Sequence, residues 1–146
     1  MKVSIGADHA GFALKAVLID FFSARGYFPV DRGAYCSAVS DYPDFAKSVS
    51  LDVLGGRADF GILICGSGIG MSITANRYKK IRAALCYDVQ AAKMAREHND
   101  ANVLCLAGRA LNVSECLEIV EAFVNSKFSC EERHKKRIEK IDEEGE

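Results

Sequence analysis

Short apolar runs alternate with amphipathic stretches along the whole chain. The runs are rich in valine, isoleucine and leucine and are nearly continuous, as in strands that are buried on both faces of a parallel sheet. The stretches between them carry apolar residues at helical spacing, so each has one apolar face. The pattern predicts strands at 2–7, 27–31, 60–65, 82–86 and 102–107, and helices at 10–25, 44–54, from the glycine-rich loop 66–70 to 78, at 88–97, from 112 and from about 130.

Local signals indicate the ends and faces of several helices. Gly26 ends the first helix, and Asp88 is placed to cap a later one. Asn112, followed three residues later by Glu115, resembles a capping box. The predicted core face of the first helix is Leu14, Val17, Leu18 and Phe21, and that of the helix from 112 is Cys116, Ile119, Val120 and Phe123.

Alternating strands and helices with short connections predict a parallel sheet covered by helices on both faces. The simplest such fold is a three-layer αβα sandwich around a five-stranded, parallel, doubly wound (Rossmann-like) sheet. No repeat or linker interrupts residues 1–146, so we expect one domain with a charged C-terminal helix. In such a sheet, ligands bind outside the carboxyl ends of the strands, where Asp8, His9 and Cys65 are expected to meet.

The composition argues against several classes of function. The 19 Lys and Arg nearly balance the 20 Asp and Glu, so no net charge attracts nucleic acid or an anionic membrane. No apolar run is long enough to cross a bilayer, and the N-terminal residues are expected to enter a strand rather than a secretory signal. Six cysteines without a C-x-x-C pair or a zinc-site spacing indicate free thiols in a cytoplasmic protein without a bound metal.

One of the six cysteines has a distinctive setting. Cys65 ends an apolar run and is followed by three glycines in five residues, whereas the others are expected to be small buried hydrophobic residues. The glycines allow a tight turn that aims several N–H groups at one point, beside the positive end of a helix. A thiolate there would be stabilised. The other cysteines are Cys36, Cys86, Cys105, Cys116 and Cys130.

The glycine-rich loop does not fit the dinucleotide-binding pattern. Gly6 to Gly11 has the spacing of a nucleoside-triphosphate loop, but the Gly-Lys-Ser/Thr of that motif does not follow, so binding of a nucleoside triphosphate is not expected. We therefore interpret the glycine-rich loop as an oxyanion site beside a reactive cysteine, made by the backbone of Gly66, Gly68, Ile69 and Gly70. Ser67 could cap the following helix, or its hydroxyl could contact two substrate oxygens.

Two histidines and two arginines are further candidates. His9 follows the first strand at the expected ligand edge, and His98 lies near the end of a helix whose dipole favours the protonated ring. A lone loop histidine is, however, more often solvated than catalytic. Arg133 and Arg137 share one helix face. From spacing alone a solvated face is the better interpretation, with a two-pronged anion clamp as the alternative.

Taken together, the motifs resemble those of the type B ribose-5-phosphate isomerases, in the same order and over essentially the whole chain. That family also includes galactose-6-phosphate and allose-6-phosphate isomerases. The resemblance is carried by GADHAGF at 6–12, DYP at 41–43, CGSGIG at 65–70, HNDAN at 98–102, GR at 108–109 and RHKKR at 133–137.

The resemblance implies interconversion of ribose 5-phosphate and ribulose 5-phosphate through an enediolate, in the pentose phosphate pathway and without metal or cofactor. It implies that Cys65 is the base at C2, that Ser67 moves a proton between O1 and O2, and that His98 opens the sugar ring. One branch of the family has a glutamate base six residues after this cysteine, where this chain has Met71. The implied sugar ligands are Asp8, Tyr42 and Asn99, and the implied phosphate ligands are His9, Arg109, Arg133 and Arg137.

The family's C-terminal arginines reach the active site of a neighbouring subunit, so the resemblance implies a homodimer or a dimer of dimers. The implied partners are a small sugar phosphate and a second copy, with no nucleic acid and no membrane. Three alternatives stay open: a six-carbon sugar phosphate as the substrate, a non-catalytic sugar-phosphate-binding protein, or a redox role for Cys65, although no resolving cysteine lies nearby in sequence.

Overall fold

Five parallel strands make one sheet, which lies between two layers of helices. The structure, a computed structural model, describes residues 1–144. The strands are β1 (Lys2–Ala7), β2 (Phe28–Asp31), β3 (Phe60–Cys65), β4 (Ala83–Leu85) and β5 (Val103–Ala107). The helices are α1 (Phe12–Ala24), α2 (Tyr42–Leu54), α3 (Ile69–Ala75), α4 (Val89–Asn99), α5 (Val113–Asn125) and α6 (Glu132–Glu143). The predicted αβα fold with a five-stranded parallel sheet is confirmed.

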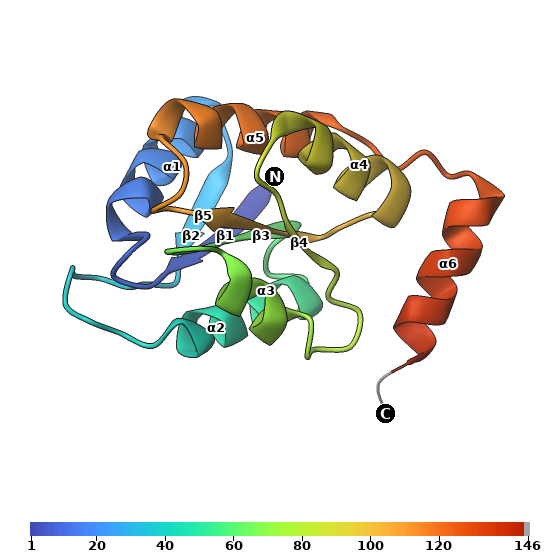
Figure 1. Ribbon diagram of the computed structural model, residues 1–146, viewed down its shortest axis with the longest axis horizontal. Coiled ribbons are helices and arrows are strands. Elements are labelled where there is room, and N and C mark those ends of the chain that lie inside the picture. Colours follow the sequence, from blue (N-terminus) through green and yellow to red (C-terminus); the bar gives the residue numbers. More distant parts are fainter. Residues whose placement is uncertain (145–146) are drawn as a thin grey trace.

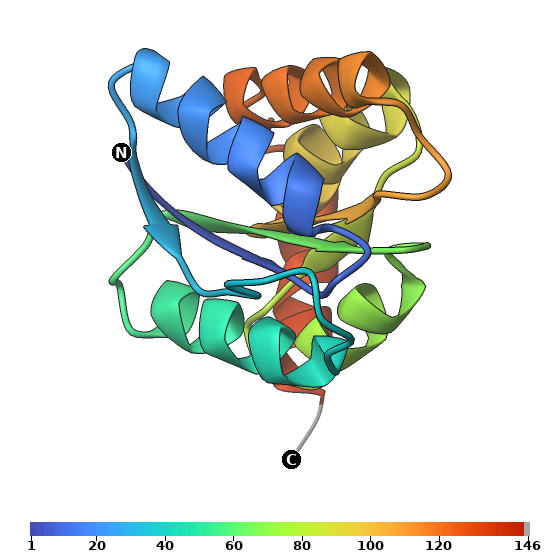
Figure 2. The ribbon, with the colours of Figure 1, turned by 90° about the vertical axis from the view of Figure 1, so that its left-hand side faces the viewer.

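The strand order is β2–β1–β3–β5–β4, so β5 lies between β3 and the edge strand β4. Figure 2 shows α1, α4 and α5 on one face of the sheet and α2 and α3 on the other. Helix α6 stands outside these layers, beside α4 (Figure 1). Because the central strands β1, β3 and β5 are parallel, their carboxyl ends lie at one edge of the sheet. The glycine-rich loop leads from this end of β3 into α3.

Strands β3 and β5 are buried on both faces because helices cover both faces of the sheet. In β3, Ile62 and Ile64 pack toward the layer of α1, α4 and α5, whereas Leu63 and Cys65 pack toward α2 and α3. All six residues of β3 and all five of β5 are buried. This explains why these strands read as continuous apolar runs rather than as alternating ones.

Several predicted boundaries and faces differ from the structure. In α1 the buried stripe continues from Leu18 to Phe22, while Val17 is exposed and Phe21 only partly buried. Residue 22 lies four positions after residue 18 and stays over the sheet, whereas the row through residue 17 turns away from it. Helix α2 begins at Tyr42, two residues earlier than predicted, with Pro43 in its first turn.

Helix α3 ends at Ala75, three residues before the predicted end. The side-chain amide of Asn76 donates to the carbonyl of Ala83 at 2.9 Å and accepts from its N–H at 2.8 Å. This pair of bonds holds the chain in a turn that leads into β4. The predicted capping of α4 by Asp88 and the predicted capping box of Asn112 and Glu115 are confirmed.

The cysteines divide differently from the prediction. Cys86, Cys105 and Cys116 are buried as expected, but Cys36 and Cys130 are exposed, so the prediction was wrong for these two. Both lie in connecting segments outside the helices and strands, where no apolar layer covers them. All six thiols are free.

A buried carboxylate joins α2 to the sheet. Asp52 accepts hydrogen bonds from Arg32 at 2.5 and 2.8 Å, from Arg57 at 2.8 Å and from the Ser4 hydroxyl at 2.8 Å. Burial alone would raise the pKa of Asp52, but the hydrogen bonds from Arg32, Arg57 and Ser4 outweigh it, so its pKa lies below the usual value. The carboxylate thus stabilises the fold only while it is ionised.

The Asp52→Asn variant is expected to lower the free energy of unfolding by about 2–3 kcal/mol at pH 7, because it puts an amide donor against two guanidinium groups. A depressed folded-state pKa means that the carboxylate's contribution is present above the unfolded pKa, near 4, and is lost as the pH falls through the folded value. The difference between wild type and variant should therefore shrink below about pH 4. Urea denaturation at pH 7 and pH 3 measures this; an equal difference at both pH values would contradict it.

Candidate active site

A cavity of about 520 Å³ opens where β1, β3 and β5 end. It combines one buried thiol, one buried carboxylate, a hydroxyl, a phenol and a guanidinium with backbone from the glycine-rich loop. Its lining residues are Asp8, Tyr42, Cys65, Gly66, Ser67, Ile69, Gly70, Ile73 and Arg109. The structure therefore brings together most of the predicted site, from segments spread over a hundred positions of sequence.

Cys65 is the last residue of β3 and is only 4% exposed, with its side chain toward α2 and α3. Its sulfur accepts a hydrogen bond from the N–H of Gly68 at 3.1 Å. A donor at that position stabilises the sulfur when it carries negative charge. The predicted contact between this cysteine and the glycine-rich loop is thus present.

The glycines of the loop are needed for close approach. Gly68 has φ of +75°, and a Cβ on it would lie 2.5 Å from Leu85 Cδ1 and 3.0 Å from the Leu106 carbonyl oxygen. A Cβ on Gly70 would overlap the ring of Tyr42. At the start of α3 the N–H groups of Gly70 and Met71 have no acceptor within the helix, as for any first turn. The helix that carries these donors begins four residues after Cys65, the last residue of β3.

Gly68→Ala is expected to destabilise the protein by about 2–4 kcal/mol, because it combines an unfavourable positive φ with a steric overlap. The variant should also lose most of its catalytic activity, because the N–H of residue 68, which donates to the Cys65 sulfur, would move. Gly26→Ala is the matched control: its φ is +77°, but no atom lies within 4 Å of the added Cβ. That variant should lose about 1 kcal/mol and keep full turnover. Equal losses of turnover in the two variants would contradict the role of the loop.

Backbone hydrogen bonds hold the loop against the end of β5. Gly108 donates to the carbonyl of Cys65 at 2.8 Å, and Arg109 donates to the carbonyl of Gly66 at 3.0 Å. These bonds place the exposed Arg109 side chain beside Gly66, at the mouth of the cavity. The Tyr87 hydroxyl also donates to the Ser67 carbonyl at 2.6 Å.

The segment after β1 forms the other wall. Asp8 is 5% exposed and its carboxylate accepts from the N–H of Ala10 at 2.9 Å. His9 is half-buried and exchanges two 3.2 Å bonds with Ser40, in which its Nδ1 accepts and its N–H donates. It lies next to the cavity but is not one of the residues that line it. Tyr42, at the start of α2, places its ring against Gly70.

Two lining or supporting residues were missed by the sequence analysis. Ile73 lies four residues after Ile69 and shares its helix face, so helical spacing could have identified it. No sequence pattern identifies Tyr87, because its hydrogen bond to Ser67 depends on β4 lying beside β5 at the edge of the sheet. The predicted residue Ser67 lines the cavity. Its hydroxyl accepts a hydrogen bond from the N–H of Ile69 at 3.2 Å, which stabilises the loop.

The remaining predicted residues lie elsewhere in the chain. His98 and Asn99 end α4, which leads into the amino end of β5, whereas Cys65 lies at the carboxyl end of the adjacent β3. Five residues of extended strand span roughly 17 Å, so the two groups of one chain lie near opposite edges of the sheet. Arg133 and Arg137 are exposed on α6, the helix that lies beside α4 (Figure 1).

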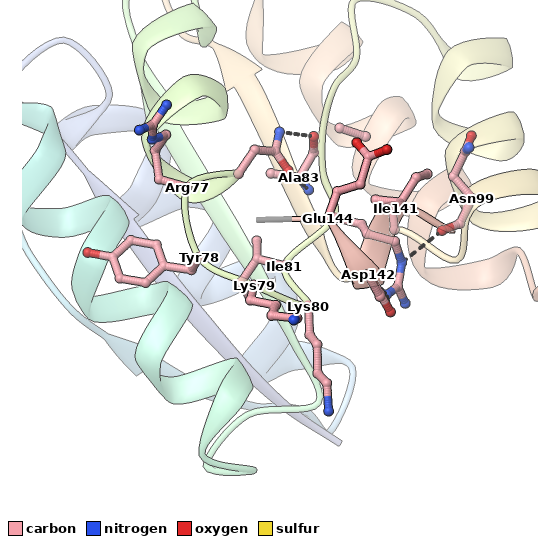
Figure 3. A pocket seen from close by; sticks show the side chains of 14 residues that line it. Arg77, Tyr78, Lys79, Lys80, Ile81, Ala83, Asn99, Ile141, Asp142 and Glu144 are labelled. Atoms are coloured by element: carbon pink, nitrogen blue, oxygen red, sulfur yellow. Dashed lines mark hydrogen bonds and ion pairs between the residues drawn. The ribbon is translucent and has the colours of Figure 1, made fainter. Parts of the chain in front are cut away.

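A second cavity, of about 350 Å³, lies near this other group (Figure 3). It separates the segment 76–84 from the end of α6, where Ile141, Asp142 and Glu144 face it. Arg82 lines one side of this cavity and forms ion pairs with Asp142 at 2.9 Å and Asp100 at 3.4 Å. Asn99, one of the predicted sugar ligands, lines this cavity, whereas the predicted catalytic residues Cys65, Ser67 and His98 do not.

Within residues 1–144, no three His, Cys, Asp or Glu side chains come together as a metal site would require. No helix in this part of the chain is both long and apolar enough to cross a membrane.

The chain is similar to known sugar-phosphate isomerases over nearly its full length. Residues 3–141 match the family described as Ribose/Galactose Isomerase. Ribose-5-phosphate isomerase B of Escherichia coli (strain K12) is 40% identical, with 96% of this chain and 93% of that protein covered. A putative sugar phosphate isomerase of Bacillus subtilis (strain 168) is 42% identical, with coverages of 97% and 95%.

Solved structures agree with these sequences. A ribose 5-phosphate isomerase from Thermotoga maritima has a TM-score of 0.95 at 46% identity, with 97% of each chain covered. The type B ribose 5-phosphate isomerase of Trypanosoma brucei has a TM-score of 0.94 at 47% identity, again with 97% of each chain covered.

Proposed function

The chain belongs to the Ribose/Galactose Isomerase family, and on that premise we propose that it interconverts D-ribose 5-phosphate and D-ribulose 5-phosphate through an enediolate. The observation that carries the proposal is the buried Cys65 sulfur, 3.1 Å from the Gly68 N–H, in a cavity whose mouth carries Arg109. A base, a set of fixed N–H donors and a cation for phosphate are the groups that this reaction needs.

The cysteine performs the proton transfer. Its thiolate removes the proton from C2 and returns it at C1, while the electron pair moves onto the carbonyl oxygen. That oxygen becomes negative as the enediolate forms, and backbone N–H groups of residues 66–70 stabilise it without reorganisation. The Ser67 hydroxyl faces the same cavity and moves the second proton between O1 and O2.

The rest of the cavity binds the substrate. Asp8 and Tyr42 hold sugar hydroxyls, and Arg109 and the neighbouring His9 bind the phosphate. The aldose must first open its ring, which needs a proton donor at the ring oxygen. We assign that role to His98, which lies in the last turn of α4 at the other end of the strands.

A second copy of the chain supplies the missing groups. A two-fold dimer puts His98 and Asn99 of one subunit, with Arg133 and Arg137 from its α6, over the cavity of the other. The exposed arginines then contact the phosphate, and the clamp interpretation replaces that of a solvated face. The free thiols are in keeping with action in the cytoplasm, within the pentose phosphate pathway.

Turnover of three substrates tests this function. Ribose 5-phosphate, allose 6-phosphate and galactose 6-phosphate are compared in the presence of EDTA, because the proposed reaction needs no metal. We expect turnover of the pentose phosphate in excess of both hexose phosphates, unchanged by the chelator. A preference for a hexose phosphate would keep the mechanism and change the substrate. No turnover on any of the three would favour a sugar-phosphate-binding protein instead.

A further inference from the structure

The ring of His134 lies flat against the ring of His98. The two centroids are 4.5 Å apart and the ring planes differ by 12°. His134 is in the first turn of α6 and is the only buried residue of that helix, whereas its neighbours Arg133 and Lys135 are exposed. This contact, together with the Arg82–Asp142 ion pair, joins α6 to the body of the molecule.

The surroundings of His134 show how the ring acts. It is 5% exposed, and within residues 1–144 its buried Nε2 has no hydrogen-bond partner. Burial lowers its pKa, and the nearby His98, Arg133 and Arg137 lower it further, against an opposite effect of Glu131. His134 therefore stays neutral near pH 7. The neutral ring therefore adds no second positive charge beside His98.

We propose that His134 is a positioning residue for His98. By stacking, its buried ring fixes the plane of the His98 imidazole for proton donation to the sugar ring. The proposal rests on the proposed role of His98 as the acid. The ring does this by stacking, since its buried nitrogen makes no hydrogen bond. It follows that a phenylalanine ring should serve almost as well, whereas a methyl group should not.

Four variants test the proposal: His134→Phe, His134→Ala, His98→Asn and the double variant His98→Asn/His134→Ala. The kcat and KM for ribose 5-phosphate are measured for each, and the binding of inorganic phosphate reports on the arginines of α6. We expect His134→Ala to lower kcat about tenfold to a hundredfold, because a small misplacement of a catalytic group costs that much. His134→Phe should stay within about threefold of wild type, as a ring of similar size is tolerated.

The double variant separates positioning from general support of the fold. If His134 acts through His98, His134→Ala causes no further loss of kcat once His98 is asparagine. Losses that multiply, or a His134→Phe variant as slow as His134→Ala, would overturn the proposal. His98→Asn alone tests the underlying assumption, because wild-type kcat in that variant would mean that His98 is not the acid. Should thermal unfolding show that His134→Ala is not folded at the assay temperature, a His134→Phe variant much slower than wild type would still overturn the proposal.

Discussion

Cys65→Ala is expected to lower turnover of ribose 5-phosphate by a factor of about 10²–10⁴, the usual contribution of a general base. The fold should survive, because the change removes only one buried sulfur atom, with a loss of about 1 kcal/mol. The most direct measurement is exchange of the C2 proton with D₂O, followed by NMR. With no base at position 65, this exchange should stop.

Cys105→Ala is the matched control. This thiol is also buried, on the strand next to β3, and burial raises the pKa of Cys105, so the sulfur stays protonated and has no role in the reaction. The control should show a similar loss of stability with turnover near that of wild type. Continued exchange at C2 in Cys65→Ala would place the base elsewhere in the cavity, whichever way the stability changed.

The second large effect is recovery of activity when two inactive variants are mixed. Cys65→Ala and His98→Asn subunits are each expected to form inactive homodimers. In a mixed dimer with shared sites, one site carries both defects and the other carries neither. Random exchange makes half of the dimers mixed, so an equal mixture should reach about a quarter of wild-type activity.

The outcome depends sharply on where His98 acts. If Cys65 and His98 of the same chain served one site, each site of a mixed dimer would carry one defect and no activity would return. Subunit exchange must be shown separately, for example by mass spectrometry of mixed dimers with one labelled variant. A mixture that exchanges but stays inactive would contradict the shared site and leave the role of Cys65 intact.

Much of the local structure could be predicted from the sequence. Both ends of β3, Phe60 and Cys65, were predicted correctly because the run is apolar throughout and a glycine follows it. The capping box at Asn112 was predicted because both of its side chains bond only to backbone within three residues. Errors occurred where partners are distant: α3 ends early because Asn76 bonds to Ala83, and the face of α1 is set by the sheet beneath it.

The carboxyl-edge half of the candidate site was predictable for a similar reason. Cys65 ends a strand, and Asp8 and Arg109 follow strands. Parallel strands end at a common edge, so the meeting of these residues needs only the correct fold class. The same reasoning puts His98 at the opposite edge, because it precedes a strand. Its motif could be recognised along the chain, but the motif does not say which subunit it serves.

By itself, the sequence determined the fold class, the position of Cys65 beside its glycine-rich loop and the family. These depend on residue type and on short-range spacing, which the chain carries directly. Only the tertiary structure decided that β5 lies between β3 and the edge strand β4, and that the ring of His134 lies against that of His98. It also decided that His98 lies at the opposite edge of the sheet from Cys65. Such facts depend on strand order and on packing between segments distant in sequence, where many arrangements satisfy the same local pattern.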